Sequence, residues 1–298
     1  MSNIQKTILS TLTKKMYTKY ISKGVSISLM KYNPKSKLFK AYKNTSYCAE
    51  TLVSNDTGKL TTTYCKNRWC QTCNRIKIAI LIKGYYSQIE EFENPCFVTL
   101  TLPTCKGNEL LERIKLMENA WRFLCNKTKR VPFKRLYNDF KGLRKAEITI
   151  RPNGFYHYHF HVLLDGLEQG EWLISQWLKK FSQASRKSQH IREVDDFGKM
   201  EIFKYAIKCE VKTSNSNAKR YDLVYNSLRG KRTFSAFGGI KKVDVEQAED
   251  DLKSNIQTDM INHVFKWMKD DWYNKETGEG LVKLPIPEKV KNMVNYPD

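Results

Sequence analysis

The feature that most constrains the fold is a pair of alternating segments joined by a turn dipeptide. Residues 143–152 (LRKAEITIRP) and 155–165 (FYHYHFHVLLD) each alternate in polarity, and Asn153-Gly154 lies between them. The alternation has the two-residue period of a strand, and Asn-Gly favours a hairpin turn. We therefore expect an antiparallel sheet built around this hairpin.

Helices and short strands are predicted on both sides of the hairpin. Apolar residues at helical spacing predict helices, and short β-branched or alternating runs predict strands. The predicted helices cover 73–92, 108–124, 170–183, 197–212 and 251–272, and the predicted strands cover 97–103 and 190–194. Interleaving of this kind indicates an α+β fold with a mainly antiparallel sheet.

Three histidines share one face of the second hairpin strand. His157, His159 and His161 alternate with Tyr158, Phe160 and Val162, so an apolar face packs on the core and an imidazole face borders a cleft. Glu147 lies on the partner strand, and its carboxylate suits Mg²⁺ or Mn²⁺. We expect His159, His161 and Glu147 to bind one such ion, with His157 as an additional candidate. Histidines on an exposed edge strand would show the same alternation without a metal.

Glu201, Tyr205 and Lys208 have the spacing of one helix face. A tyrosine hydroxyl is a weak nucleophile that needs activation, which a divalent ion and a nearby lysine supply. This segment predicts Tyr205 as a nucleophile toward phosphorus, Lys208 as its electrostatic partner and Glu201 as a general base. The alternative is an ordinary buried tyrosine beside an exposed ion pair.

The charge balance indicates a polyanionic partner. Lysine and arginine total 52 against 31 acidic residues, a net charge of +21, which favours nucleic acid over simple solubility charge. The first 49 residues contain ten lysines and no acidic residue. They are predicted to be a phosphate-binding extension or a disordered tail. No apolar run is long enough to cross a membrane and no signal peptide is recognisable, so we expect a cytoplasmic protein.

Four cysteines lie close together in the sequence. Cys70 and Cys73 form a close pair, preceded by Cys65 and Cys48, a pattern that indicates metal ligation in a reducing compartment. A redox role for the close pair is the alternative. The remaining thiols are expected to be ordinary buried cysteines, namely Cys96, Cys105, Cys125 and Cys209.

Taken together, these segments resemble the HUH replication initiators, the rolling-circle Rep proteins of small plasmids from Gram-positive bacteria. Residues 97–103 resemble the first motif of that family, 157–164 the second, and 201–208 the third. Tyr158 departs from the family, which often has proline there. It faces away from the ligands, so we expect no loss of activity.

The resemblance implies an HUH endonuclease fold, with a five-stranded antiparallel sheet, flanking helices and a small cysteine-rich zinc-binding segment. It assigns the metal-binding histidines to His159 and His161, the catalytic tyrosine to Tyr205, and hydrolytic termination to Glu201. It also implies four zinc ligands at Cys48, Cys65, Cys70 and Cys73. The residues expected to contact DNA are Lys66, Arg68, Arg75, Lys77 and Arg151.

The predicted organisation has four parts: a basic extension (1–45), a zinc-binding segment (46–80), a nicking domain (81–240) and a C-terminal helical extension (241–298). The expected function is to nick single-stranded or hairpin origin DNA of a plasmid, forming a 5′-phosphotyrosine and a 3′-OH primer. Host helicase and polymerase are the expected partners, and no ATP-binding motif is found. The alternatives are a relaxase or single-tyrosine transposase, or a non-catalytic zinc protein that binds nucleic acid.

Overall fold

The protein is described here by a computed structural model covering residues 3–55, 59–137, 139–204, 215–244, 262–294 and 296. Its helices are α1 (Asn3–Tyr32), α2 (Phe39–Ser46), α3 (Gln71–Glu90), α4 (Leu110–Thr128), α5 (Val131–Leu136), α6 (Leu167–Lys180), α7 (Asp196–Lys199), α8 (Asn215–Ser227) and α10 (Glu288–Lys291), with 3₁₀ turns η1 (Gly107–Glu109), η2 (Arg186–Ser188) and η3 (Met200–Phe203). Its strands are β1 (Thr51–Ser54), β2 (Leu60–Thr62), β3 (Pro95–Thr101), β4 (Gly142–Ile150), β5 (Tyr156–Asp165), β6 (His190–Glu193), β7 (Phe234–Phe237), β8 (His263–Met268) and β9 (Asp271–Asn274).

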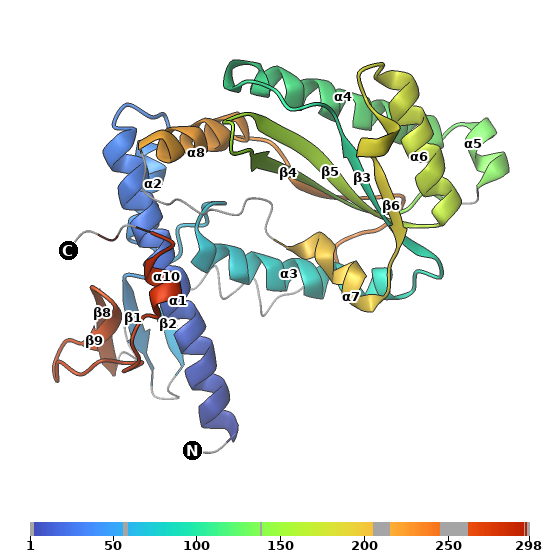
Figure 1. The fold of residues 1–298 in the computed structure, drawn as a ribbon. Coiled ribbons are helices and arrows are strands. Elements are labelled where there is room, and N and C mark those ends of the chain that lie inside the picture. The colour runs from blue at the N-terminus through green and yellow to red at the C-terminus, as the bar shows by residue number, and fades with distance from the viewer. Residues whose placement is uncertain are drawn as a thin grey trace. The chain divides into compact units, whose positions relative to one another are not determined.

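These elements form two compact units. The first takes its described residues from 1–80, 209–222 and 245–298, and the second from 81–208 and 223–244. The second unit contains a five-stranded sheet of order β6-β3-β5-β4-β7, in which every neighbouring pair is antiparallel (Figure 1). The predicted α+β class with a five-stranded antiparallel sheet and flanking helices is therefore confirmed.

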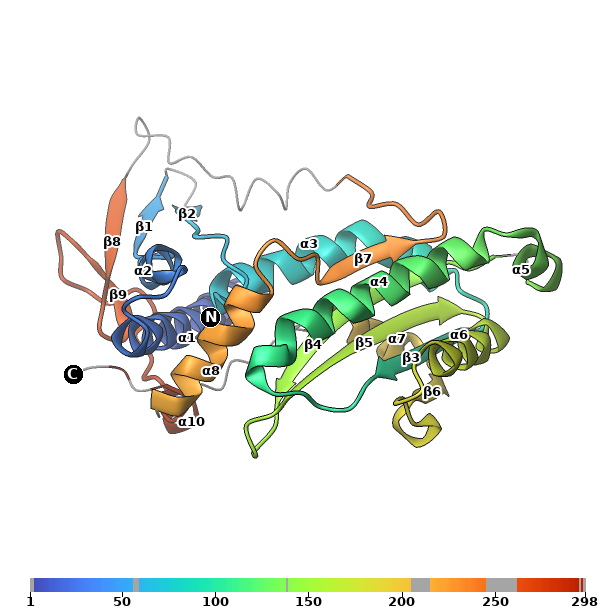
Figure 2. The same ribbon diagram turned by 90° about the horizontal axis from the view of Figure 1, so that it is seen from above.

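The central hairpin joins β4 to β5 as the sequence predicted. Its pairing ends at Ile150 and Tyr156, and Gly154 takes a positive φ of 84° in the connecting loop. On the core face, Tyr158 and Phe160 are buried beneath α4 and α6, where the Trp121 ring meets Phe160 edge to face. Figure 2 shows α4 and α6 running along this side of the sheet. The histidine face is left on the other side, where η3 packs against β4 and β5.

The first unit contains a second antiparallel sheet, of order β2-β1-β8-β9. Its β8–β9 hairpin spans residues 263–274, of which the sequence pattern had assigned 263–272 to a helix. Their apolar residues, including the buried Trp267 and Trp272, pack on neighbouring elements at strand spacing. In a segment this short, the spacing of apolar residues is compatible with both a helix and a strand. Only the pairing of β8 with β1 shows that the segment is a strand.

The N-terminal residues are part of this unit and not an extended arm. Helix α1 is buried along its second half, with Val25 and Leu29 at 2% and 0% exposure. Lys19 is also buried, and its ammonium pairs with Glu50 at 2.6 Å. Lys19 of the basic N-terminal segment is therefore a buried, ion-paired residue.

A single helix was predicted over 197–212, and the described residues of this range, 197–204, do not form one continuous α-helix. They are divided into α7 and η3, and Lys204 then takes an extended ψ of 160°. The change to 3₁₀ geometry at η3 ends the α-helical hydrogen bonding that the spacing had suggested. Among the described residues, no helix is long and apolar enough to cross a lipid bilayer.

Candidate metal centres and nucleic-acid interface

Glu147, His159 and His161, here called the histidine cluster, converge on one face of the five-stranded sheet. Pairing of β4 with β5 places Glu147 directly opposite His159, and His161 lies two residues further along the same face. The two Nε2 atoms are 3.2 Å apart, and Oε2 of Glu147 is 3.5 Å from each of them. All three ligand atoms lie within 4.8 Å of one another, so they could hold one ion together.

The other imidazole nitrogens both have hydrogen-bond partners. Nδ1 of His161 lies 3.2 Å from Oγ1 of Thr99 on β3, and Nδ1 of His159 lies 3.2 Å from the carbonyl oxygen of His157. A carbonyl oxygen can only accept, so His159 carries its proton on Nδ1 and presents a lone pair on Nε2. Outer hydrogen bonds of this kind orient histidine ligands toward a metal.

Lys145 fixes the carboxylate of the cluster. Its buried ammonium forms an ion pair with Oε1 of Glu147, which leaves Oε2 for the histidines. Burial alone would raise the pKa of Glu147, but the neighbouring His159 and His161 side chains, together with Lys145, lower it well below its usual range. Glu147 is therefore a charged ligand at neutral pH.

His157 lies outside this cluster, although it shares the same strand face. Its Nε2 hydrogen-bonds Oγ1 of Thr101, and its Nδ1 lies 3.1 Å from a guanidinium nitrogen of Arg151. Its ring stacks on that of His159 at 4.9 Å. Burial, helped by the neighbouring His159 and Arg151, lowers the pKa of His157 to about 4.

The third candidate segment is described only up to residue 204. Glu201 accepts hydrogen bonds from Lys204 at 2.9 Å and from Arg192 at 2.7 Å. The Lys204 hydrogen bond is the main reason that the pKa of Glu201 is lowered, so its carboxylate is ionised at neutral pH. Tyr205 and Lys208 lie outside the described residues.

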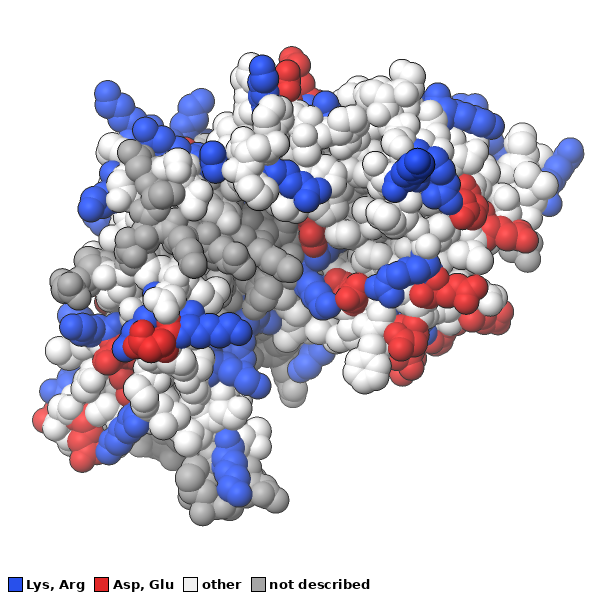
Figure 3. All heavy atoms as spheres, viewed as in Figure 1, with Lys and Arg blue, Asp and Glu red and all other residues white. Residues whose placement is uncertain are grey.

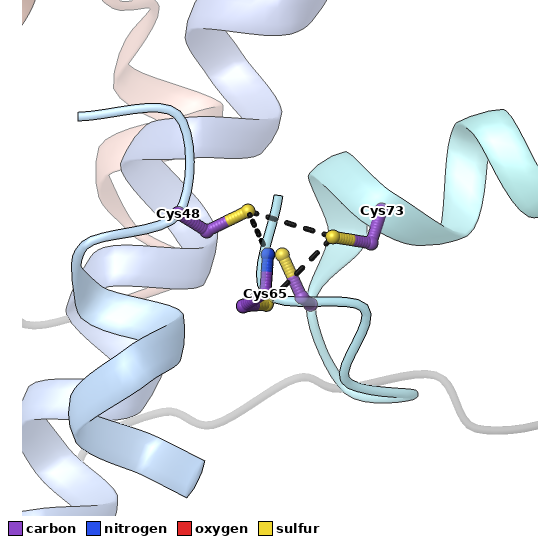
Figure 4. Close-up of side chains that lie close together, drawn as sticks. Cys48, Cys65 and Cys73 are labelled. Atoms are coloured by element: carbon purple, nitrogen blue, oxygen red, sulfur yellow. Dashed lines mark hydrogen bonds between the residues drawn. The ribbon is translucent and has the colours of Figure 1, made fainter. Parts of the chain in front are cut away.

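A second ligand group, here called the cysteine cluster, comes from three segments of the first unit. Cys48 precedes β1, Cys65 lies between β2 and α3, and Cys70 and Cys73 lie at the start of α3. Sγ of Cys73 is 3.4 Å from Sγ of Cys48 and 3.7 Å from that of Cys65. Figure 4 shows the sulfurs of Cys48, Cys65 and Cys73 pointing toward a common centre.

The geometry of the cysteine cluster fits a tetrahedral metal ion. Thiolates about 2.3 Å from a tetrahedral zinc lie roughly 3.8 Å apart, close to the spacing found here. Backbone N–H groups of Cys65 and Lys66 also donate to Sγ of Cys48 and Cys73, at 3.4 and 3.3 Å. Hydrogen bonding between Cys48 and Cys65 lowers the pKa of Cys65 and raises that of Cys48.

Basic residues surround the cysteine cluster. Lys66 is exposed at a φ of 58°, and Nζ of Lys77 donates to its carbonyl oxygen at 2.5 Å. Arg68 and Arg75 are half-buried nearby in the sequence, while Arg151 is exposed in the hairpin loop of the second unit. Figure 3 shows lysine and arginine side chains spread over the visible face, with acidic side chains in several separate groups.

The described thiols outside the cysteine cluster stay largely protonated at neutral pH. Burial raises the pKa of Cys96 to about 12 and that of Cys125 to about 11, and it also raises the pKa of Cys105. Cys209 lies outside the described residues.

Two residues of the histidine cluster's surroundings are absent from the sequence-based prediction. Lys145 is two positions before Glu147 on β4, so strand alternation alone places it on the same face. Thr99 is different, because it reaches His161 only through the pairing of β3 with β5, which the sequence pattern does not specify.

Comparison with known proteins identifies the family. Residues 58–275 match the family Rep_1, described as replication protein. A protein named Protein rep from Lentilactobacillus hilgardii is 27% identical over 279 residues, which cover 80% of this chain and 87% of the relative. Another Protein rep, from Staphylococcus aureus, is 32% identical over 107 residues, covering 34% of this chain and 44% of the relative. No solved structure gives a significant match. Because the family match spans more than half of the 298 residues, the chain belongs to the Rep_1 family of replication proteins, as its resemblance to plasmid Rep proteins predicted.

Proposed function

We propose that this replication protein is a plasmid rolling-circle initiator of the HUH type, a metal-dependent endonuclease and strand transferase that nicks single-stranded origin DNA. The observation that carries this proposal is the histidine cluster, in which two imidazole nitrogens and one carboxylate oxygen lie within 4.8 Å. This donor set suits Mn²⁺ or Mg²⁺, and its carboxylate supplies the hard ligand that these ions prefer.

In the proposed reaction, the Tyr205 hydroxyl attacks the scissile phosphorus. The tyrosine hydroxyl loses its proton as a bond forms between its oxygen and phosphorus. The bond from phosphorus to the 3′ oxygen breaks, and that oxygen takes up a proton to leave as a 3′-OH primer. A bound divalent ion would polarise the phosphate and stabilise the charge that develops on it. Lys208 adds a second positive charge for the same purpose.

Glu201 is proposed to activate the closing step. Its carboxylate is ionised and can accept a proton from water or from a second hydroxyl that attacks the phosphotyrosine. Support comes from η3, which ends two residues before Tyr205 and packs against β4 and β5, the strands that carry the histidine cluster. Its residues Ile202 and Phe203 are buried there, at 0% and 2% exposure.

The cysteine cluster is proposed to be a structural zinc site that steadies a basic DNA-binding segment. Three of its four thiols are buried, and backbone N–H groups donate to two of the sulfurs. Four cysteine ligands are a common set in structural zinc sites. Lys66, Arg68, Arg75 and Lys77 would then contact DNA phosphates, and host helicase and polymerase would act on the nicked plasmid.

The test is a nicking assay on single-stranded origin DNA, with mass detection of a covalent adduct. The wild type is expected to form an adduct at Tyr205 only when Mn²⁺ or Mg²⁺ is added, and Tyr205→Phe is expected to form none. Tyr47→Phe is the matched control, since Tyr47 is exposed and lies in the other unit. An adduct on Tyr205→Phe would refute the nucleophile. If neither protein forms an adduct but both bind DNA, a non-catalytic role is favoured.

A further inference from the structure

A groove of about 480 Å³ lies beside the histidine cluster. Its walls come from the end of β3, the start of β5, the hairpin loop and residues 183–190. Its size falls within the range of pockets that hold small-molecule ligands. Thr99 and His157 belong both to its wall and to the surroundings of the cluster ligands.

The chemistry of the groove suits an anion with hydrogen-bonding groups. Arg151 and Lys187 line it, and both are exposed, while none of the described residues lining it carries a carboxylate. Five of the lining residues bear hydroxyl groups: Thr99, Thr101, Thr104, Ser185 and Ser188. Arginine, lysine and hydroxyl side chains are the groups that commonly bind DNA phosphates.

Hydrogen-bond direction makes His157 the residue that orients Arg151. A guanidinium can only donate, so Nδ1 of His157 accepts from Arg151 at 3.1 Å. Nε2 of His157 then carries the proton and donates to Oγ1 of Thr101. The Thr101 hydroxyl in turn donates to the carbonyl oxygen of Leu102 at 3.1 Å. Each donor in this series has one acceptor, which defines a single tautomer of His157.

Thr101 is a rigid anchor for this series. The backbone N–H of Thr101 donates to Oε1 of the buried Gln189 at 2.8 Å, and its carbonyl oxygen accepts from Nε2 of Gln189 at 3.2 Å. Trp177 donates to the same carbonyl at 3.0 Å. The pairing of β3 with β6 ends at Thr99 and His190, and the side chain of Gln189 then continues the contact with the end of β3.

We propose that this groove binds one nucleotide of single-stranded DNA beside the histidine cluster, with Arg151 holding its phosphate and His157 serving as the positioning residue for Arg151. This inference rests on the proposed function, because it names the site where that reaction's DNA is held. It also removes His157 from the set of metal ligands and gives it a separate role.

The first test measures binding of fluorescein-labelled (dT)₁₂ by fluorescence polarisation over a range of salt concentrations, without added Mg²⁺ or Mn²⁺. Arg151→Gln is expected to weaken binding about tenfold, as for loss of a charge-assisted hydrogen bond. It should also make the slope of log K against log salt shallower by about 0.7, the value for one phosphate on single-stranded DNA. The matched control is Arg135→Gln, an exposed arginine on α5, before the start of β4. An unchanged affinity and slope for Arg151→Gln would overturn the proposal.

The second test is a double-mutant cycle between Arg151 and His157. His157→Phe is expected to reproduce the shallower slope, and adding Arg151→Gln should cause no further loss, because both changes remove one phosphate contact. Mn²⁺ affinity should stay within about twofold of wild type, whereas loss of a metal ligand would abolish it. Additive losses, or loss of Mn²⁺ binding, would refute the positioning role. If His157→Phe does not fold, His157→Asn is the substitute, since its side chain is too short to reach both partners.

The outcomes also separate this inference from the proposed nicking reaction. If Arg151→Gln changes the salt slope but the wild type forms no Tyr205 adduct, the groove binds DNA and the catalytic proposal is wrong. If the adduct forms normally in Arg151→Gln and the slope is unchanged, the groove has no role and the catalytic proposal stands.

Discussion

At the residue scale, Lys145 supports the histidine cluster by pairing with Glu147, although it is not itself a candidate metal ligand. The Lys145 side chain is 4% exposed and pairs with one oxygen of Glu147, while the other oxygen faces both histidines. Burial lowers the pKa of Lys145, and the Glu147 carboxylate opposes that shift. The lysine therefore restricts the carboxylate to one orientation and leaves one oxygen for an ion.

Replacing Lys145 by methionine should weaken metal binding and preserve the fold. The carboxylate of Glu147 loses its buried partner and is free to rotate, so the Mn²⁺ dissociation constant should rise about 10- to 100-fold, as for loss of other outer-shell partners. Isothermal titration calorimetry with Mn²⁺ measures this change. Lys141→Met is the matched control, because Lys141 pairs with Asp165 just before β4 begins. An unchanged Mn²⁺ affinity in Lys145→Met would contradict this account.

The buried thiols allow a second prediction about single residues. With a pKa of about 12, Cys96 is a thiolate in only roughly 1 molecule in 10⁴ at pH 8. It is also fully buried, whereas Cys125 has a pKa of about 11 and is partly accessible. Iodoacetamide at pH 8 should therefore label Cys125 before Cys96, as peptide mass mapping can show. As a control, the difference between the two cysteines should disappear in urea. Equal labelling rates for Cys96 and Cys125 in the native protein would contradict this prediction.

Alternation along a single strand made part of the site predictable. It placed His159, His161 and Glu147 on one face and Tyr158 and Phe160 on the other, and the register confirms this arrangement. It could not show that His157 differs from its neighbours. That difference arises from Thr101, on another strand, and from the loop that holds Arg151.

At the element scale, the β4–β5 hairpin positions every histidine-cluster ligand, so its turn is a sensitive point. Gly154 has a φ of 84°, a conformation that strongly disfavours β-branched residues. Gly154→Val should lower the free energy of unfolding of the second unit by about 1–2 kcal/mol. Gly154→Asn, which tolerates positive φ, should cost less. Chemical denaturation followed by tryptophan fluorescence compares the two variants, and equal losses would exclude backbone strain as the cause.

Elements with local signals were predicted more successfully than elements defined by distant pairing. Helices α4 and α6 carry amphipathic patterns, and α3 has apolar residues at helical spacing. Strand β3 is rich in β-branched residues and β4 and β5 carry alternation, so all of these elements were expected. Strand β8 pairs with β1 across a long sequence separation, and its six residues contain no decisive period. The break after η3 depends on Lys204 turning to an extended conformation, which residue spacing alone does not reveal.

At the scale of the whole molecule, the chain builds two units from discontinuous segments, each with its own candidate metal centre. The cysteine cluster lies entirely in the first unit and the histidine cluster in the second. The four-part linear division expected from the sequence follows composition, whereas the first unit collects strands from both ends of the chain. Changes of composition along the sequence do not reveal that a late segment joins an early one, because strand pairing between distant segments leaves no local signal.

Under the proposed zinc assignment, this division predicts that removing the metal affects the two units unequally. The cysteine cluster ties α3 to the segments before β1 and after β2, so extraction with a zinc chelator such as TPEN should destabilise the first unit and lower its thermal transition. All three ligands of the histidine cluster come from β4 and β5, so Mn²⁺ titration after removal of the chelator should give nearly the wild-type affinity. Cys70→Ser should reproduce the chelator's effect, and Cys125→Ser, outside the cluster, should not. Differential scanning calorimetry would refute the zinc assignment if neither the chelator nor Cys70→Ser shifted a transition. Loss of Mn²⁺ binding with the zinc would instead show that the two centres depend on each other.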